Sequence, residues 1–186
     1  MENNTKYVST FRECTIDDDT ALWMARMCVG EGGLKCSVEK ASAMLWALMH
    51  RWHLWDRRQR YSTYLELMRA FSQPINPRWR AGGDLAERWK GSVFASPARL
   101  LRRSRISSLK WQKIAPHIRQ AVTDFQNGVL FPPGVLTTIL RARITNWASL
   151  KKTPKKFPWG VDIDGDWFFE DAGIRNGIVR VERLEQ

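Results

Sequence analysis

The sequence predicts a mostly helical α+β domain with a small antiparallel β-sheet. Up to about Gly128, apolar side chains recur at helical spacing between recognisable N-cap and C-cap residues. After Pro132-Pro133-Gly134 the helical period is lost, and short alternating segments with a hairpin turn follow. A length of 186 residues with 44% hydrophobic residues is enough for one domain with a buried core. We therefore expect a polar arm over residues 1–19 and a single domain over residues 20–186.

The first predicted helix runs from about Thr20 to Glu31, after the N-cap and acidic residues that begin at Asp17. Gly32-Gly33 should end it, because glycine adopts the left-handed conformation without strain. Glu31 then lies at the helix C-terminus, where the helix dipole disfavours the ionised carboxylate, as a general acid requires. An ordinary solvated residue at a helix end is the competing interpretation, and the local sequence alone favours it.

A second helix begins after Ser37, a good N-cap residue, and ends in His50-Arg51. Its apolar side chains follow i, i+3, i+4 spacing, which predicts a buried stripe that packs across the first helix and orients Glu31. The stripe consists of Ala41, Met44, Leu45, Leu48, Met49 and Trp52.

The third helix has a capping box, Thr63 to Glu66, and stops at Phe71-Ser72-Gln73-Pro74. The following segment, 72–83, contains two prolines and a glycine pair, so we expect no regular structure there. It is equally consistent with a ligand-contacting loop and with a plain connector.

Further helices are predicted after Ser96-Pro97 and from Pro116, and strands in the last quarter of the chain. The first of these helices carries a basic patch, and the second has an apolar stripe and is capped by Gly128. The remaining expectations are an alternating strand over 143–147, an exposed basic loop over 151–156, a hairpin over 161–169 that turns at Asp164-Gly165, and a final strand over 177–183. The patch is Arg99, Arg102, Arg103 and Arg105; the stripe is Ile118, Ala121, Val122 and Phe125.

The net charge of +11 and the isoelectric point near 10.1 imply an anionic partner. Nucleic acid, a membrane surface and a bacterial cell wall all qualify. The three cysteines and three histidines show no metal-binding spacing, so we expect no metal and no cofactor. The beginning of the chain lacks the pattern of a secretory signal, and no apolar run is long enough to predict a transmembrane segment.

Five short motifs, taken in order, resemble the catalytic domain of the SleB-like family of spore cortex-lytic cell-wall hydrolases. They are Glu31-Gly32, His50-Arg51, Phe71-Ser72, the helix from Ala121 to Gly128, and Asp166-Trp167-Phe168-Phe169. The resemblance spans roughly 20–171. It departs from the family at His50, where the family usually has Asn, and over 76–107, which has no clear counterpart. The basic, tryptophan-rich chain looks like a phage-encoded member.

The resemblance implies a lysozyme-like fold and cleavage of the β-1,4 bond between N-acetylmuramic acid and N-acetylglucosamine in peptidoglycan. It implies a lytic transglycosylase, in which Glu31 is the single catalytic acid and base and the 6-hydroxyl of the muramic acid attacks the anomeric carbon. A muramidase stays open as the other form of this enzyme. Ser72 and Gln73 would position the sugar or the acid. A glycan cleft also needs flat apolar walls, for which Trp147, Trp159 and Trp167 are the candidates. Such a protein would reside in a phage virion or in the host cytoplasm before release, with other virion proteins as candidate partners.

Two alternatives stay open at this stage. Asp162, Asp164 and Asp166 could supply the second carboxylate of ordinary glycoside hydrolysis, although alternating acids at a turn are more often solvated turn formers. The competing function is a non-enzymatic basic virion protein that binds nucleic acid or cell wall. The net charge and the arginine patch support it, but the sequence contains no recognisable DNA- or RNA-binding motif, and we expect no specific nucleic-acid partner.

Overall fold

The computed structural model describes residues 6–7, 14–33, 36–52, 61–127, 146–149 and 160–169. These ranges contain six α-helices, three short 3-10 helices and five strands. The helices are α1 (Asp18–Gly32), α2 (Val38–His50), α3 (Tyr64–Phe71), α4 (Asp84–Arg88), α5 (Pro97–Ser107) and α6 (Pro116–Gln126), with 3-10 helices η3 (Pro77–Trp79), η4 (Val93–Ala95) and η5 (Trp111–Lys113). The strands are β1 (Lys6–Tyr7), β2 (Cys14–Thr15), β3 (Asn146–Ser149), β4 (Gly160–Ile163) and β5 (Asp166–Phe169). The predicted mostly helical α+β architecture with a small antiparallel sheet is confirmed.

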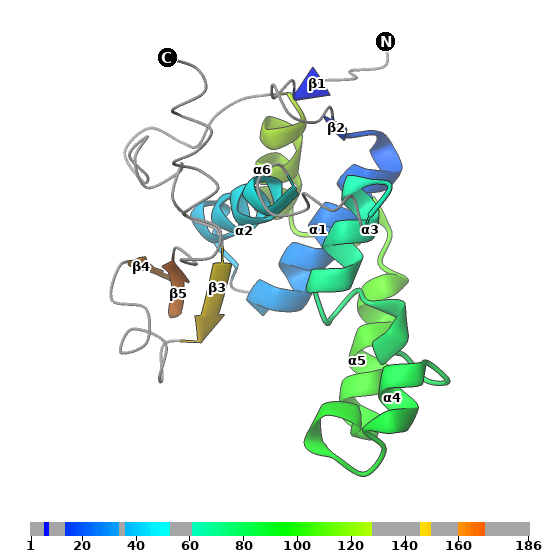
Figure 1. Ribbon diagram of the computed structural model, residues 1–186. Helices are drawn as coiled ribbons and strands as arrows, with labels where there is room; N and C mark the ends of the chain where they lie inside the picture. Colours follow the sequence, from blue (N-terminus) through cyan, green and yellow to red (C-terminus); the bar gives the residue numbers. More distant parts are fainter. Residues whose placement is uncertain are drawn as a thin grey trace.

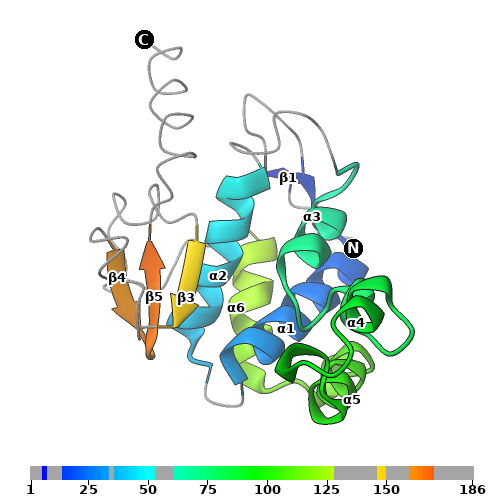
Figure 2. The ribbon, with the colours of Figure 1, turned by 60° about the horizontal axis from the view of Figure 1, so that its bottom comes forward.

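Helices α1, α2 and α6 form the centre of the molecule (Figure 1). The small sheet β3-β5-β4 lies beside α2, whereas α4 and α5 lie at the opposite side of the helical centre (Figure 2). The short strands β1 and β2 pair antiparallel near the start of the chain. This arrangement leaves the C-terminal end of α1 between the sheet and α5.

At the centre of the core, the predicted apolar faces of α2 and α6 pack on α1, and α3 and the sheet also contribute buried residues. Every residue of the α2 stripe is at most 3% exposed, and the α6 stripe is at most 2% exposed. Burying a leucine or methionine side chain in this way stabilises a fold by roughly 1.5–3 kcal/mol. Ile16 is also fully buried in this core. The end of the predicted arm therefore belongs to the folded domain.

Three predicted N-caps are present. The side chains of Asp17, Ser37 and Thr63 accept hydrogen bonds from the backbone N–H three residues later, over 2.8, 3.1 and 3.1 Å. Helix α1 extends to Gly32, and Gly33 follows it with a φ of 72°. The glycine stop is thus confirmed, because a residue with a side chain would be strained at that angle.

The predicted hairpin turns at Asp164 and Gly165, whose φ angles of 51° and 77° match the paired left-handed conformations of a type I′ turn. Strand β5 is central and pairs with β3 on its other edge. Lys40 of α2 anchors the hairpin, because its Nζ is 2.8 Å from the Asp166 carboxylate and donates to the Asp164 carbonyl over 3.1 Å. The Asp164 carboxylate also accepts from the backbone N–H of Ser37.

The segment predicted to lack regular structure, 72–83, contains the 3-10 helix η3. The expectation of no regular structure is therefore wrong for residues 77–79. Asn76 caps this turn, because its Oδ1 accepts a hydrogen bond from the Arg78 N–H over 2.9 Å. Pro77 supplies the φ angle that the first position of a helix needs. Arg103 of α5 holds the segment in place by donating to the carbonyls of Trp79 and Phe94 over 3.1 and 2.9 Å.

Three predicted features, the basic loop 151–156, the cap at Gly128 and the strand 177–183, lie outside the described residues. None of the helices in the described ranges combines the length and hydrophobicity that crossing a bilayer requires.

Candidate functional site

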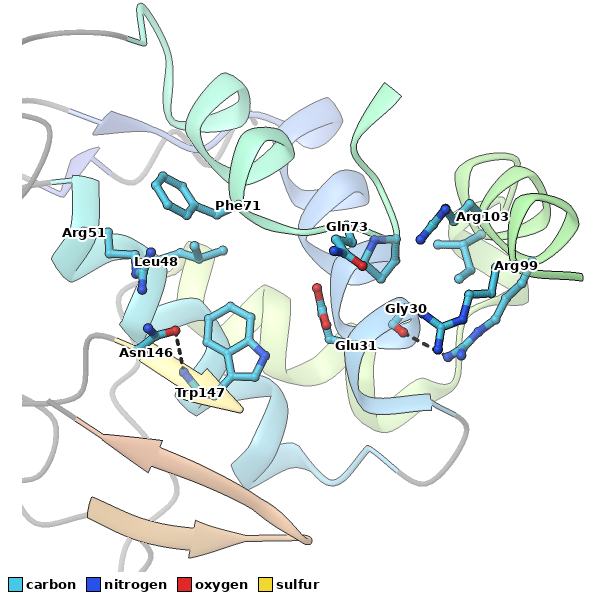
Figure 3. A pocket seen from close by; sticks show the side chains of 13 residues that line it. Gly30, Glu31, Leu48, Arg51, Phe71, Gln73, Arg99, Arg103, Asn146 and Trp147 are labelled. Atoms are coloured by element: carbon cyan, nitrogen blue, oxygen red, sulfur yellow. Dashed lines mark hydrogen bonds between the residues drawn. The ribbon is translucent and has the colours of Figure 1, made fainter. Parts of the chain in front are cut away.

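A pocket of about 530 Å³ lies at the C-terminal end of α1. Its walls come from the ends of α1, α2 and α3, from one face of α5 and from β3 (Figure 3). The volume falls within the range of small-molecule sites in proteins. Glu31 points into this pocket, between Trp147 on the sheet side and the arginines of α5 on the other.

Ser72 fixes the Glu31 carboxyl group. The Ser72 hydroxyl donates to Glu31 Oε1 over 2.9 Å, and Ser72 itself is fully buried. Ser72 follows the last residue of α3, and its N–H closes that helix on the Met68 carbonyl. Its carbonyl accepts from Ile75 and Asn76, so the backbone of this turn is held on both sides. The predicted proximity of the Phe71-Ser72-Gln73 turn to Glu31 is confirmed.

Gly30 allows this turn to approach α1 closely. A Cβ atom at position 30 would lie 2.3 Å from Pro74 Cβ, far inside van der Waals contact. Only glycine therefore permits the present spacing between α1 and the turn that carries Ser72. The glycine and the hydrogen bond that it makes possible together determine where the Glu31 carboxyl lies.

Burial raises the pKa of Glu31 above the usual value of a glutamate, and the charge of Asp166 adds to the increase. The Ser72 hydrogen bond and the charge of Arg102 act in the opposite direction. The sequence predicted the same direction from the helix dipole, but the largest cause is desolvation inside the pocket. A carboxyl group in this setting keeps its proton to higher pH and can donate it to a bound substrate.

Glu31 is the one carboxylate among the described residues that line the pocket. The three aspartates considered as a second carboxylate have other partners: Asp164 and Asp166 hold the hairpin to α2, and Asp162 accepts from the Gly165 N–H over 3.0 Å. None of the three lines the pocket. The interpretation of these acids as turn formers is therefore the one that the structure supports.

One face of α5 gives the pocket a cationic wall. Arg99, Arg102 and Arg103 follow i, i+3, i+4 spacing and all line the pocket, whereas Arg105 does not. Arg102 donates to the carbonyl of Gly30 over 3.0 Å, next to the acid. Arg103 is 5% exposed and uses its guanidinium on the carbonyls described above. Within the described residues none of the three forms an ion pair with a carboxylate.

Trp147 forms the aromatic wall opposite these arginines. It lies on β3, is partly exposed, and packs its indole on Phe168 with ring centroids 6.3 Å apart. Asn146 lines the same wall, and its Oδ1 accepts from the Trp147 N–H. At the far end of the pocket, the Arg51 guanidinium lies 4.7 Å from the centre of the Phe71 ring.

The predicted site residues are thus brought together in part. Glu31, Gln73 and Trp147 line the pocket, and Ser72 lies behind Glu31. Trp167 does not line the pocket. Phe168 pairs with Trp147 and therefore lies on the same face of the sheet, whereas Trp167 pairs with Ala148. Because consecutive strand residues point to opposite faces, Trp167 points away from the face that carries Trp147. Of these two candidate tryptophans, Trp147 therefore lines the pocket and Trp167 does not. Trp159 lies outside the described residues.

The pocket also contains polar residues that were not predicted as site residues, namely Arg51, Arg99, Arg102, Arg103 and Asn146. The i, i+3, i+4 spacing of the arginines marked one helix face, but nothing local showed that this face meets the end of α1.

No group of three or more His, Cys, Asp or Glu side chains within the described ranges is arranged to hold a metal ion. Cys28 and Cys36 are buried free thiols, and burial raises their pKa values, to about 11 for Cys36. Both therefore remain protonated at neutral pH and are poor nucleophiles.

No family model matches the chain, and the comparisons with curated proteins and with solved structures gave no match.

Proposed function

We propose that this protein cleaves the glycan strands of peptidoglycan at the β-1,4 bond between N-acetylmuramic acid and N-acetylglucosamine. The observation that carries the proposal is the carboxyl group of Glu31, which has a raised pKa, is fixed by Ser72 and faces a pocket of about 530 Å³. The ordered motifs that resemble SleB-like hydrolases support the same reaction and a lysozyme-like fold.

A single carboxyl group is sufficient for the lytic transglycosylase form of this reaction. Protonated Glu31 donates its proton to the glycosidic oxygen as the bond to the anomeric carbon breaks. The C6 hydroxyl of the same muramic acid then attacks the anomeric carbon, and the Glu31 carboxylate accepts the hydroxyl proton. The products are a 1,6-anhydromuramic acid end and a free hydroxyl on N-acetylglucosamine, and Glu31 is protonated again. Ordinary glycosidases need a second carboxylate, and none lines the described part of this pocket.

The walls of the pocket suit a substrate that consists of sugar rings and peptide stems. The indole face of Trp147 can pack against the apolar face of a sugar ring, and Gln73 offers an amide to its polar groups. Arg99 and Arg102 lack carboxylate partners among the described residues and face the same space. They are suited to the carboxylates of the peptide stems that the glycan carries.

The net charge of +11 would draw the protein to an anionic wall at long range. Association with a phage virion, or storage in the host cytoplasm before release, fits an enzyme that acts on the bacterial wall. Both belong to this proposal.

The direct test is mass spectrometry of the muropeptides released from purified sacculi. The wild-type protein should release products with 1,6-anhydromuramic acid, and Glu31→Gln should release almost none. Glu87→Gln is the matched control, because the Glu87 side chain is 58% exposed on α4, outside the pocket. Products with reducing muramic acid ends would instead assign a muramidase. No release of muropeptides by the folded wild-type protein would contradict the proposal.

The second candidate is a non-enzymatic protein that binds nucleic acid or cell wall. The cationic wall on α5 and the net charge favour it, because both attract polyanions without any chemistry. Strongly salt-dependent binding to DNA together with no muropeptide release would select this alternative.

A further inference from the structure

A second cationic cluster lies around Trp23, away from the pocket. The guanidinium carbons of Arg26, Arg69 and Arg80 are 4.4, 4.0 and 5.7 Å from the centre of the Trp23 ring. Trp23 and Arg26 belong to α1, Arg69 to α3, and Arg80 follows η3. None of these four residues lines the pocket, so the cluster has no place in the chemistry proposed for Glu31.

The hydrogen-bonding capacity of the cluster is largely unused. Arg26 donates from its Nε to the Leu109 carbonyl over 3.0 Å. The Nε atoms of Arg69 and Arg80 are buried and have no partner in the described structure. Neither Arg69 nor Arg80 forms a hydrogen bond or an ion pair there, and both side chains are partly exposed. Their terminal nitrogens are therefore free to bind a ligand from solvent.

The charges of the three arginines oppose one another. Burial lowers the pKa of Arg26, and the charges of Arg69 and Arg80 lower it further, while Asp19 acts in the opposite direction. Burial also lowers the pKa of Arg80, and the charge of Arg69 adds to this. Asp19 forms no ion pair with Arg26 among the described contacts. An indole ring has two faces and can pack one guanidinium group on each, so packing on Trp23 alone does not account for three.

We propose that Arg26, Arg69 and Arg80 form a binding site for a phosphate group. A bound oxyanion compensates the three positive charges and gives the terminal guanidinium nitrogens of Arg69 and Arg80 the acceptors they lack. A carboxylate has two oxygens and is satisfied by one bidentate arginine, whereas a phosphate has enough oxygens for several arginines at once. Trp23 holds the guanidinium groups in place, since all three lie against its ring. The phosphate group can come from a free phosphate or from a phosphodiester polymer.

The site joins α1, α3 and the segment after η3, which are elements that also surround Glu31. It nevertheless rests on different residues from the proposed cleavage reaction, and either proposal can fail alone.

Isothermal titration calorimetry at constant ionic strength tests the site. Inorganic phosphate is titrated into the wild-type protein, into Arg69→Gln/Arg80→Gln, and into the control Arg88→Gln/Arg105→Gln. The control loses the same charge from two exposed arginines, one on α4 and one on α5 outside the pocket. We expect saturable binding of one phosphate to the wild-type and control proteins, and an affinity at least ~10-fold lower in the Arg69/Arg80 variant, since hydrogen bonds to charged groups are lost.

Circular dichroism verifies that each variant is folded. Arg80 is the farthest of the three arginines from the ring, so the single variant Arg80→Gln disturbs the packing least and serves if the double variant does not fold. A rise in Tm of about 3 °C for the wild-type protein at tenfold its Kd for phosphate is an independent measure.

Two further ligands define the source and the class of the anion. A 12-nucleotide single-stranded DNA that binds more tightly than phosphate, with the same loss in Arg69→Gln/Arg80→Gln, supports a phosphodiester polymer; weaker binding of the DNA supports a free phosphate. Acetate that binds as tightly as phosphate would overturn the assignment to phosphate. The absence of saturable phosphate binding by the wild-type protein, or equal binding by both double variants, would overturn the site itself.

Discussion

The Ser72 hydroxyl donates a hydrogen bond to the Glu31 carboxylate over 2.9 Å, although 41 residues separate the two in the sequence. Glu31 comes from the last turn of α1 and Ser72 from the residue after α3. The bond favours the charged form of the carboxyl group, while burial in the pocket favours the neutral form and is the larger effect. The balance between the hydrogen bond and the burial sets the pH range over which Glu31 can donate a proton.

Glu31→Gln should reduce lytic activity on sacculi by ~10²-fold or more, because the amide keeps the shape of the side chain but cannot exchange the proton. The rate of turbidity loss measures the effect, with Glu87→Gln as the control that should keep full activity. Unchanged lysis by a folded Glu31→Gln protein would remove Glu31 from the chemistry.

The same variant should be more stable than the wild-type protein at neutral pH. Because the pKa of Glu31 is raised in the folded state, the folded protein loses stability as pH rises from about 4.3, the usual pKa of glutamate, through the folded-state pKa. Below that window the carboxyl group is protonated in both the folded and the unfolded state, so it causes no change of stability with pH. The difference in Tm between Glu31→Gln and wild type should therefore grow from pH 3.5 to 8. A difference that does not change with pH would show that Glu31 has an ordinary pKa.

Ser72→Ala should raise the pKa of Glu31 further, because it removes the hydrogen bond that favours the carboxylate. The alkaline limb of the pH–activity profile should move to higher pH, and stability should fall by about 1 kcal/mol. Ser104→Ala, a change at an exposed position on α5, is the control and should leave the limb in place. A loss of stability without any movement of the limb would make Ser72 a purely structural residue.

Gly30→Ala should destabilise the protein by about 1–3 kcal/mol, because the new methyl group would overlap Pro74. The turn has to move away from α1, which weakens the Ser72–Glu31 contact and lowers activity. Chemical denaturation of a double-mutant cycle with Pro74→Gly checks the cause. The cost of Gly30→Ala should be smaller in the Pro74→Gly background, and equal costs in both backgrounds would place the strain elsewhere.

Trp147→Ala should weaken glycan binding and turnover at every salt concentration, because Trp147 forms the apolar wall opposite the arginines. Trp167→Ala is the matched control, since Trp167 lies on the same sheet but outside the pocket. Steady-state kinetics on soluble glycan strands should show the loss for Trp147→Ala alone. Equal losses for both variants would indicate damage to the sheet rather than to the binding site.

Local chemistry was enough to predict most of the elements. The caps at Asp17, Ser37 and Thr63, the glycine stop at Gly33 and the turn at Asp164-Gly165 all depend on residues a few positions apart. The buried stripes of α2 and α6 follow from the helical period alone. The turn at η3 was missed although Asn76 and Pro77 carry its local pattern, because the prolines and glycines around them were interpreted only as breakers.

Local patterns were therefore enough to predict five of the six described helices, the hairpin and the position of Glu31 at a helix end before glycine, whereas the short helix α4 was not predicted. The side chains that surround that carboxyl group come from other elements, and no local pattern identified them. The contact with Ser72 depends on how closely Gly30 lets α1 approach Pro74, and the cationic wall depends on where α5 crosses α1. Strand pairing placed Trp147 in the pocket and left Trp167 outside, a choice of face that alternation in one strand cannot make. Such contacts join distant parts of the chain, so their geometry depends on the packing of whole elements rather than on any local pattern.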